Sequence, residues 1–304
     1  MVLPVALGPA QAREGRPQVA AALQSVVAVL PVWPADKKRN EEPEGSGVVV
    51  LDGSHIITAL HVLGEATHVR IATHDGEVMD AQIAGRDEAT DLALLKIENE
   101  LKPLAFAGDP EIGDEACAIG NAFGLGLSVT CGTVSAVHRA GTGFNPIEDF
   151  VQTDAAVNPG ASGGALLAAD GTLIGILSAI FTKQSDANIG VNFAVSAPLA
   201  ARVAAALRAE GRVRHNAAGL RLVPALTGND IGMQGAAVER VVQGGAGERA
   251  GIAPGDMVLY AGSRRIRAPA DFVSALDRLE PPASMSLRVA RDGAEREITL
   301  QIGN

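Results

Sequence analysis

Short apolar runs separated by turn residues fill the first two thirds of the chain. One set comprises Ser25–Trp33, Gly47–Leu51, His55–Ala59, His68–Thr73, Met79–Arg86 and Leu92–Ile97. A second set comprises Glu115–Ile119, Ser128–His138, Phe150–Thr153, Ala165–Leu167, Leu173–Phe181 and Val191–Val195. Many short strands at this spacing are typical of a closed barrel or a sandwich. Two strand-rich halves of similar length therefore predict two small barrels side by side.

The pattern changes to helical spacing after the second set. The stretch Ser196-Ala197-Pro198 has a capping serine followed by a proline in the first turn. Leu199, Val203 and Leu207 recur on one face, and Gly211 is a typical helix stop. We expect an amphipathic helix over this stretch.

A smaller unit of mixed pattern follows a polar stretch. Its predicted elements are the strands Gly235–Val242 and Met257–Tyr260, the helix Pro269–Leu279, and the strand pair Met285–Ala290 and Glu295–Gln301. We therefore divide the chain into a tail at 1–13, a strand-rich domain at 14–211, a linker at 212–218 and a second domain at 219–304.

Composition narrows the class of protein. The chain has 304 residues, 47% of them hydrophobic and 20% charged, as in globular proteins. Its net charge of −10 argues against nucleic acid or an anionic membrane surface as the main partner. No apolar run reaches the ~20 residues that span a bilayer, so we expect no integral membrane segment.

The first residues fit two interpretations. Val2–Pro9 is apolar, and Ala10-Gln11-Ala12 has the small-x-small pattern of a signal-peptidase site, but a basic leading segment is absent. We interpret residues 1–12 as a truncated signal peptide. A disordered cytoplasmic tail is the alternative.

Cys117 and Cys131 are the only cysteines, so the chain has neither a disulfide framework nor a cysteine metal cluster. They flank a predicted hairpin centred near Gly124, where they could face each other across two strands. We expect buried free thiols.

One serine lies among three glycines in the stretch Asn158–Leu166. Glycine permits positive φ and close approach, so a tight bend here can expose the Ser162 hydroxyl and align neighbouring N–H groups. Such N–H groups can form an oxyanion hole. Taken alone, the stretch also fits a glycine-rich loop with an incidental serine.

A nucleophilic serine needs a base, and the base needs a carboxylate that holds its tautomer. His61 ends a β-rich run, and Asp91 opens the apolar run Leu92–Ile97, where a carboxylate is costly unless it is paired. The order His61, Asp91, Ser162 is that of chymotrypsin-like double barrels. The nucleophile elbow of α/β-hydrolases is excluded because predicted strands, not a helix, follow Ser162.

No other stretch predicts a metal or a cofactor. Gly124-Leu125-Gly126 lacks a following helix, so it is not a phosphate loop. No metal-ligand spacing relates the remaining histidines, which are His55, His68, His74, His138 and His215.

Together these stretches resemble the HtrA/Deg family of trypsin-like serine proteases with one C-terminal PDZ domain. The resemblance runs from about Ser25 to the end of the chain, and it is carried by Thr58–Val62, Thr90–Ile97, Ala118–Gly126 and Gln152–Gly164. It implies a mostly β fold: a chymotrypsin-like double β-barrel followed by a small α+β PDZ domain.

The resemblance also implies roles for the site residues. His61 would be the general base, Asp91 its orienting carboxylate and Ser162 the nucleophile. The backbone N–H groups of Gly160 and Ser162 would form the oxyanion hole.

The strand Gly190–Val195 matches the strand that lines the S1 pocket in the family, with Val191, Asn192 and Phe193 as substrate-binding residues. It contains no acidic residue, so we expect a preference for small or medium aliphatic residues at the cleaved position. The loops Val137–Asp149 and Ser178–Asn188 match the family's regulatory and activation loops.

Gly235–Val238 and Glu248–Asp256 match the PDZ pattern. PDZ domains bind a C-terminal peptide as an added strand and hold its carboxylate with backbone N–H groups. The matching loop contains Leu220, Arg221 and Leu222, and the charge of Arg221 favours a carboxylate.

The resemblance implies an ATP-independent serine endopeptidase without a cofactor. It would cleave unfolded or misfolded proteins in the periplasm or another extracytoplasmic compartment, as a homotrimer. The family usually has asparagine and proline at the positions of Ala161 and Ala165. These two departures motivate the alternative, a protease-like peptide-binding adaptor or chaperone with little hydrolysis.

Overall fold

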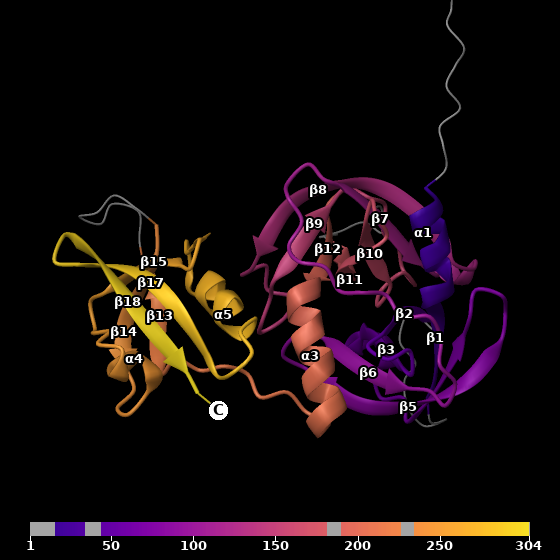
Figure 1. The fold of residues 1–304 in the computed structure, drawn as a ribbon, viewed down its shortest axis with the longest axis horizontal. Coiled ribbons are helices and arrows are strands. Elements are labelled where there is room, and N and C mark those ends of the chain that lie inside the picture. Colours follow the sequence, from indigo (N-terminus) through magenta and orange to yellow (C-terminus); the bar gives the residue numbers. More distant parts are fainter. Residues whose placement is uncertain (1–15, 34–43, 181–189, 226–233, 304) are drawn as a thin grey trace, which may run out of the picture.

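The strands of the computed structural model close into two barrels, and a third sheet follows them (Figure 1). The structure describes residues 16–33, 44–180, 190–225 and 234–303. The signal-peptide interpretation of residues 1–12, and most of the predicted loop at 178–188, lie outside these residues.

The first barrel has the strand order β1-β2-β3-β6-β5-β4. The helix α1 (Pro17–Ala21) and the 3₁₀ turn η1 (Ala22–Ser25) precede it, and the one-turn helix α2 (Leu60–Leu63) follows β3. Each apolar run of the first set is a strand. The bounds are β1 (Val26–Val32), β2 (Gly45–Val50), β3 (His55–Ala59), β4 (His68–Ala72), β5 (Val78–Asp87) and β6 (Leu92–Lys96).

The second barrel has the order β10-β11-β12-β9-β8-β7, and each run of the second set is a strand in it. The 3₁₀ turn η2 (Ala122–Gly124) separates β7 from β8. The bounds are β7 (Glu115–Gly120), β8 (Ser128–Arg139), β9 (Phe150–Thr153), β10 (Ala165–Ala168), β11 (Leu173–Ile180) and β12 (Asn192–Ser196). The expected double barrel is confirmed.

The helix α3 (Ala197–Glu210) packs against both barrels. Ser196 caps it by accepting a hydrogen bond from the Leu199 N–H, and Gly211 ends it in a left-handed conformation. The predicted apolar face, Leu199, Val203 and Leu207, is fully buried in a cluster that contains residues of both barrels. This cluster holds the two barrels together. Among the described residues, none of the helices combines the length and the apolar character that a bilayer crossing requires.

The two cysteines form a disulfide, so the expectation of free thiols is wrong. Strands β7 and β8 pair in a register that places Cys117 directly opposite Cys131, with the Cα atoms 4.1 Å apart. Cys117 is buried, whereas Cys131 is exposed. The predicted hairpin was correct, and its register brings the sulfur atoms within bonding reach.

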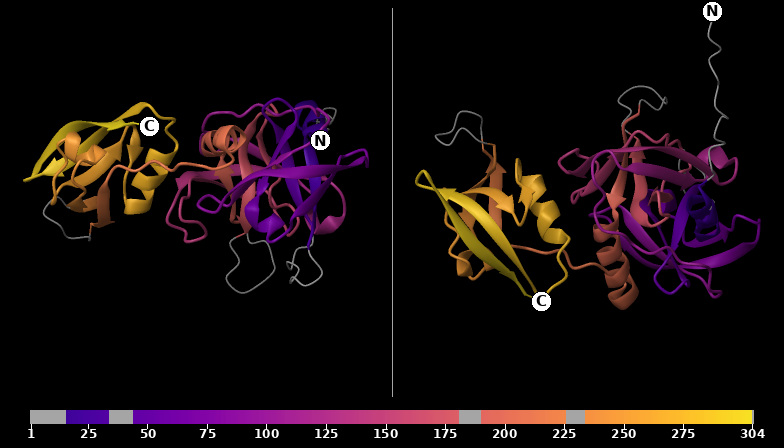
Figure 2. Two further views of the ribbon diagram at one scale, coloured as in Figure 1. Left: turned by 90° about the horizontal axis from the view of Figure 1, so that it is seen from below. Right: turned by 45° about the horizontal axis from the view of Figure 1, so that its top comes forward.

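The third sheet has the order β13-β14-β15-β17-β18, with β16 paired to β15. The helix α5 (Pro269–Asp277) lies on the side of this sheet that faces the barrels (Figures 1 and 2). The other bounds are β13 (Leu220–Pro224), β14 (Ala236–Val241), α4 (Ala246–Arg249), β15 (Met257–Ala261), β16 (Arg264–Arg265), β17 (Ala283–Arg291) and β18 (Ala294–Ile302).

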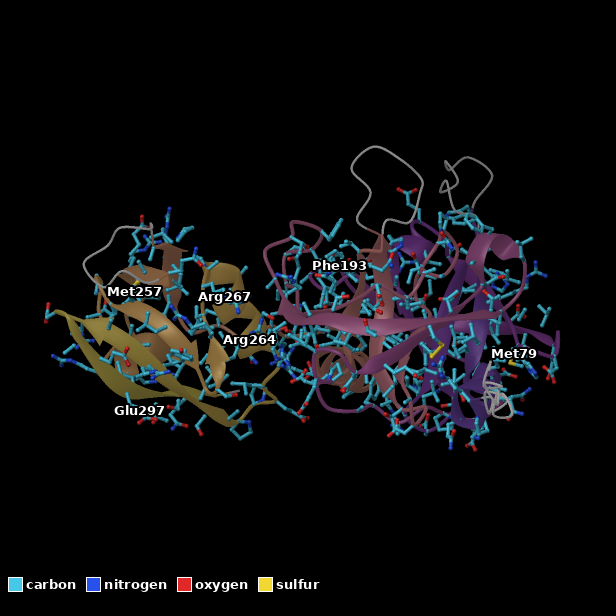
Figure 3. All side chains as sticks on the ribbon, turned by 90° about the horizontal axis from the view of Figure 1, so that it is seen from above. Met79, Phe193, Met257, Arg264, Arg267 and Glu297 are labelled. Carbon is cyan, nitrogen blue, oxygen red and sulfur yellow. A yellow bond between two sulfur atoms is a disulfide. The ribbon has the colours of Figure 1, made fainter. Side chains whose placement is uncertain are left out.

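Polar contacts join the third sheet's unit to the barrels around Asp149. The Asp149 carboxylate is fully buried and accepts hydrogen bonds from Arg264 at 2.9 Å and from Ser274 at 3.0 Å. Arg278 is a further ion-pair partner at 3.3 Å. Burial alone would raise the pKa of Asp149, but the hydrogen bond from His138 and the charges of Arg264 and Arg278 outweigh burial and lower this pKa to about 2. Figure 3 shows Arg264 at the side of its unit that faces the barrels.

A second contact involves the linker. His215 lies between Asp277 of α5 and Asp87 at the end of β5, with 2.8 Å from a ring nitrogen to each carboxylate. Arg202 of α3 also binds Asp277, at 3.1 Å. Residue 215 therefore connects the barrels to the third sheet's unit.

Candidate active site

The structure joins His61 and Asp91. Strands β3 and β6 are paired with Ala59 opposite Leu92, so the residues just beyond these strand ends lie next to each other. The Nδ1 atom of His61 is 2.6 Å from Oδ2 of Asp91, and the His61 backbone N–H donates to Oδ1 at 2.9 Å. A carboxylate on Nδ1 fixes the proton there and leaves Nε2 as the proton acceptor of a neutral ring. His61 thus has the arrangement of an oriented general base.

Strand β11 links Asp91 to the turn that carries Ser162. The Ser178 hydroxyl donates to Oδ2 of Asp91 at 3.5 Å. The preceding residue, Leu177, accepts from the Gly163 N–H at 2.7 Å and donates to the Gly164 carbonyl at 2.8 Å. Two adjacent residues of one strand therefore contact both parts of the site.

The Ser162 turn packs directly on the end of β3, just before His61. Gly163 has a φ of 83°, and a Cβ atom there would lie 2.4 Å from Oγ1 of Thr58 and 2.1 Å from the Ser46 carbonyl oxygen. Only glycine fits such a close approach at positive φ. The turn that carries Ser162 and the residues before His61 are thus in contact. Among the described residues, no hydrogen bond joins the Ser162 hydroxyl to the His61 ring.

Hydrogen bonds hold the carbonyl groups around Ser162. The Pro159 carbonyl accepts from the Phe123 N–H at 2.7 Å, and the Ala161 carbonyl accepts from the Gly164 N–H at 2.9 Å. In a planar trans peptide the N–H points opposite to the C=O. These bonds therefore set the directions of the Gly160 and Ser162 N–H groups, without any side-chain hydrogen bond from position 161.

The predicted S1 residues lie at the start of β12, next to the second barrel's core. Asn192 is fully buried, and its Nδ2 donates to the Ala155 carbonyl at 2.8 Å. Phe193 is also buried, with ring centroids 5.6 Å from Phe150 and 5.9 Å from Phe144. Val191 packs against the same core. The side chains of Asn192 and Phe193 thus pack inside the second barrel, and their predicted role in substrate binding stays a prediction.

The predicted peptide-binding residues lie in β13. Leu220–Leu222, expected in a loop, form the first part of this strand, which among the described residues pairs only with β14. Arg221 forms an ion pair with Glu239 on β14, so its charge already has a partner. The edge of β13 next to α5 is a surface to which an extended peptide can be added as a strand.

Asp109, His138 and Asp149 place ligand atoms within 4.8 Å of one another. Arg278 binds Asp109 at 2.7 Å, and Arg264 binds Asp149 at 2.9 Å. Because guanidinium groups take the carboxylate oxygens that a cation would use, this cluster is an ion-pair network between the domains.

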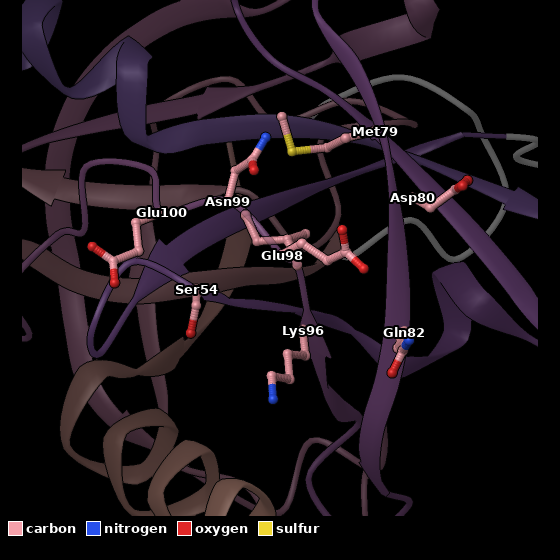
Figure 4. Close-up of a pocket in the computed structure, with 9 residues that line it drawn as sticks. Ser54, Met79, Asp80, Gln82, Lys96, Glu98, Asn99 and Glu100 are labelled. Carbon is pink, nitrogen blue, oxygen red and sulfur yellow. The ribbon is translucent and has the colours of Figure 1, made fainter.

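A cavity of about 660 Å³ opens on the first barrel (Figure 4). Its lining includes Ser54, which precedes β3, and Lys96, which ends β6. His61 follows β3 and Asp91 precedes β6, so the cavity lies at the opposite ends of these strands. It is separate from the candidate active site.

Comparison with known proteins identifies the two units. The trypsin-like peptidase domain family matches residues 45–176, and the PDZ domain family matches residues 187–302. A probable periplasmic serine endoprotease DegP-like of Chlamydia trachomatis is 34% identical over 87% of this chain and 55% of its own length. The periplasmic pH-dependent serine endoprotease DegQ of Escherichia coli is 33% identical over 85% of this chain and 59% of its own length. The chain thus spans little more than half the length of these curated relatives.

A solved structure of the HtrA-type protease AlgW with a tripeptide is 34% identical, with a TM-score of 0.73. The match covers 95% of this chain and 97% of the AlgW chain. Since both domains and their order agree over nearly the full length of the two chains, this chain belongs to the HtrA family of trypsin-like serine proteases with a PDZ domain.

Proposed function

We propose that this chain is an ATP-independent serine endopeptidase of protein quality control that cleaves unfolded or misfolded proteins. The observation that carries the proposal is the His61–Asp91 hydrogen bond of 2.6 Å beside the turn that bears Ser162. Family membership supports the same reaction. An extended, unfolded segment suits this site because a folded domain does not expose its backbone to a catalytic cleft.

In this mechanism Ser162 Oγ attacks the substrate carbonyl carbon while its proton passes to Nε2 of His61. Asp91 stabilises the resulting imidazolium through Nδ1. The Gly160 and Ser162 N–H groups stabilise the oxyanion. The protonated His61 then donates to the leaving amine, and a water molecule, deprotonated by His61, hydrolyses the acyl-enzyme.

The adaptor alternative rested on Ala161 and Ala165. The hydrogen bonds that the Pro159 and Ala161 carbonyls accept from backbone N–H groups weaken this argument, because they order the turn without an asparagine. We therefore retain the enzyme as our proposal.

Incubation of unfolded β-casein with the wild type and with Ser162→Ala tests the assignment. We expect cleavage by the wild type and none by Ser162→Ala. Cleavage by both proteins, or by neither in the presence of activating C-terminal peptides, would contradict the enzyme assignment, and the second outcome would favour the adaptor.

Partners and location are further parts of the proposal. The curated relatives are named as periplasmic proteins, and a disulfide is typical of an oxidising compartment, which supports a periplasmic location. We propose that C-terminal peptides add to the edge of β13 near Leu220–Leu222, that aliphatic residues are favoured at the cleaved position, and that the protein forms a homotrimer.

We also propose the domain division 14–211, 212–218 and 219–304. It is supported by the end of α3 at Glu210 and the start of β13 at Leu220. Separate expression of residues 14–211 tests it, with a cooperative unfolding transition as the expected result.

A further inference from the structure

Ser46, on β2, is fully buried and contacts the Ser162 turn at two points. Its hydroxyl donates a hydrogen bond to the Gly160 carbonyl at 2.8 Å, and its backbone N–H donates to the Ser162 carbonyl at 2.8 Å. The same hydroxyl accepts from the Asn121 N–H at 2.8 Å. Ser46 itself is held by Thr58, whose hydroxyl donates to the Ser46 carbonyl at 2.6 Å.

With these bonds, each of the four carbonyl groups from Pro159 to Ser162 accepts a hydrogen bond. The carbonyls of Pro159 and Ala161 are held by backbone N–H groups, and those of Gly160 and Ser162 are held by Ser46. No peptide plane between residues 159 and 163 can rotate without breaking at least one of these bonds. The proposed oxyanion donors, the Gly160 and Ser162 N–H groups, lie in the Pro159–Gly160 and Ala161–Ser162 planes, and the Gly160–Ala161 plane that the Ser46 hydroxyl holds connects these two planes.

The Ser46 hydroxyl also connects the turn to the segment that holds Pro159. Asn121, which donates to this hydroxyl, lies two residues before Phe123, whose N–H binds the Pro159 carbonyl. The packing is close, since a Cβ atom at Gly120 would lie 2.8 Å from the Ala161 Cα and 3.0 Å from Ser46 Oγ. Position 161 is alanine and supplies no polar side chain to the turn, whereas Ser46 supplies a hydroxyl from β2.

We propose that Ser46 is a positioning residue of the protease, whose hydroxyl holds the Gly160–Ser162 turn in the orientation that stabilises the oxyanion. The inference rests on the proposed function. Ser46 does not touch the substrate. It acts through the Gly160 carbonyl, so its loss weakens transition-state binding and leaves substrate binding intact.

Ser25 provides a matched control. It is also a fully buried serine of the first barrel's region, but among the described residues its hydroxyl has no hydrogen-bond partner. Truncation of Ser25 and of Ser46 removes the same atom from similarly buried positions. Only the truncation of Ser46 removes a hydrogen bond to the turn that carries Ser162.

The test measures kcat and KM for cleavage of fluorescently labelled β-casein by the wild type, Ser46→Ala, Ser25→Ala and Ser162→Ala. Inhibition by a peptide boronic acid, which binds as a tetrahedral adduct, is measured in parallel. Near-ultraviolet circular dichroism and thermal unfolding report whether each variant is folded. Ser46→Cys, which keeps a weaker donor at this position, is the second variant.

For Ser46→Ala we expect kcat to fall about tenfold to a hundredfold, less than the ~10²–10³ typical for loss of an oxyanion donor itself. KM stays within about twofold, and boronate affinity falls in step with kcat. Ser46→Cys is intermediate, and Ser25→Ala matches the wild type.

A folded Ser46→Ala with the kcat of Ser25→Ala, or one that changes KM alone, overturns the inference. If Ser46→Ala does not fold, the kcat and KM of Ser46→Cys are judged by the same criteria. If neither variant folds, Ser46 is a purely structural residue, and this result also overturns the inference. Failure of the proposed function is recognised separately, because it shows in the wild type and in Ser162→Ala.

Discussion

Asp91 adopts a left-handed backbone conformation, with φ 58°, immediately before β6. Aspartate and asparagine are among the few residues with a side chain that tolerate this region. The conformation lets one carboxylate bind both the backbone N–H and the ring of His61. Asparagine also tolerates this φ, so Asp91→Asn removes the negative charge of the side chain and keeps the backbone conformation.

We predict that Asp91→Asn lowers kcat for casein cleavage by about 10⁴-fold, because the amide favours the wrong tautomer of His61. The thermal unfolding midpoint should remain close to that of the wild type. Asp80→Asn is the control, since Asp80 forms an exposed pair with His68 at 3.1 Å, outside the site, and its variant should keep full activity. Activity of Asp91→Asn within tenfold of the wild type would contradict the assignment of His61 as the base.

The sequence predicted His61, Asp91 and Ser162 as site residues from their order along the chain and from the stretches around them, and the structure brings His61 and Asp91 into hydrogen-bond contact. The sequence did not identify Ser46 or Ser178. Serine is ordinary in strands, and the partners of these hydroxyls lie 114 and 87 residues away in the chain. Contacts over such separations depend on how the two barrels pack, which no local pattern contains.

At the scale of elements, the spacing of apolar residues predicted the strands of both barrels and α3, whereas β13 was expected as a loop and the two-residue strand β16 was not predicted. The Ser196 cap and the Gly211 stop set the ends of α3 for local reasons. The helix α4 was not predicted, because one turn over Ala246–Arg249 is too short for a helical period. The hairpin of β7 and β8 was predicted without its register, so the pairing of its cysteines remained open.

The disulfide gives a prediction for this hairpin. It closes a loop with a sequence separation of 14, for which removal typically costs about 3 kcal/mol of unfolding free energy. We expect dithiothreitol to lower the thermal unfolding midpoint of the wild type and to leave that of the Cys117→Ala/Cys131→Ala double variant unchanged. A thiol assay on denatured, unreduced protein should detect no free thiol, and detection of two would refute the pairing.

The contact between the barrels and the PDZ domain is a property of the whole molecule, and no sequence motif predicted it. Asp149 and Arg264 are 115 residues apart, and each has an ordinary sequence neighbourhood. His138 and His215, for which the sequence showed no metal-ligand spacing, also take part in this contact. His138 binds Asp149, and His215 lies between two carboxylates, where its pKa is raised to about 9 by the hydrogen bond to Asp277 and then by the bond to Asp87.

His215 therefore makes stability depend on pH in alkaline solution. A histidine whose pKa is higher in the folded state contributes stability that is complete below its unfolded value of 6.5 and is lost as pH rises towards about 9. Arg202 is a second cationic partner of Asp277. We predict that the thermal unfolding midpoint of the wild type exceeds that of His215→Gln most below pH 6.5, and that this gap shrinks as pH rises and closes above about 9.

Differential scanning calorimetry of the two proteins between about pH 6 and about pH 9.5 measures this gap. His68→Gln is the control, because His68 also pairs with a carboxylate, Asp80, but on the exposed surface of the first barrel. Its gap to the wild type should be small at every pH. If the difference in unfolding midpoint between the wild type and His215→Gln stays constant across this range, His215 does not hold its proton between Asp87 and Asp277. The predicted decrease in this difference requires His215 to lose its proton within the range.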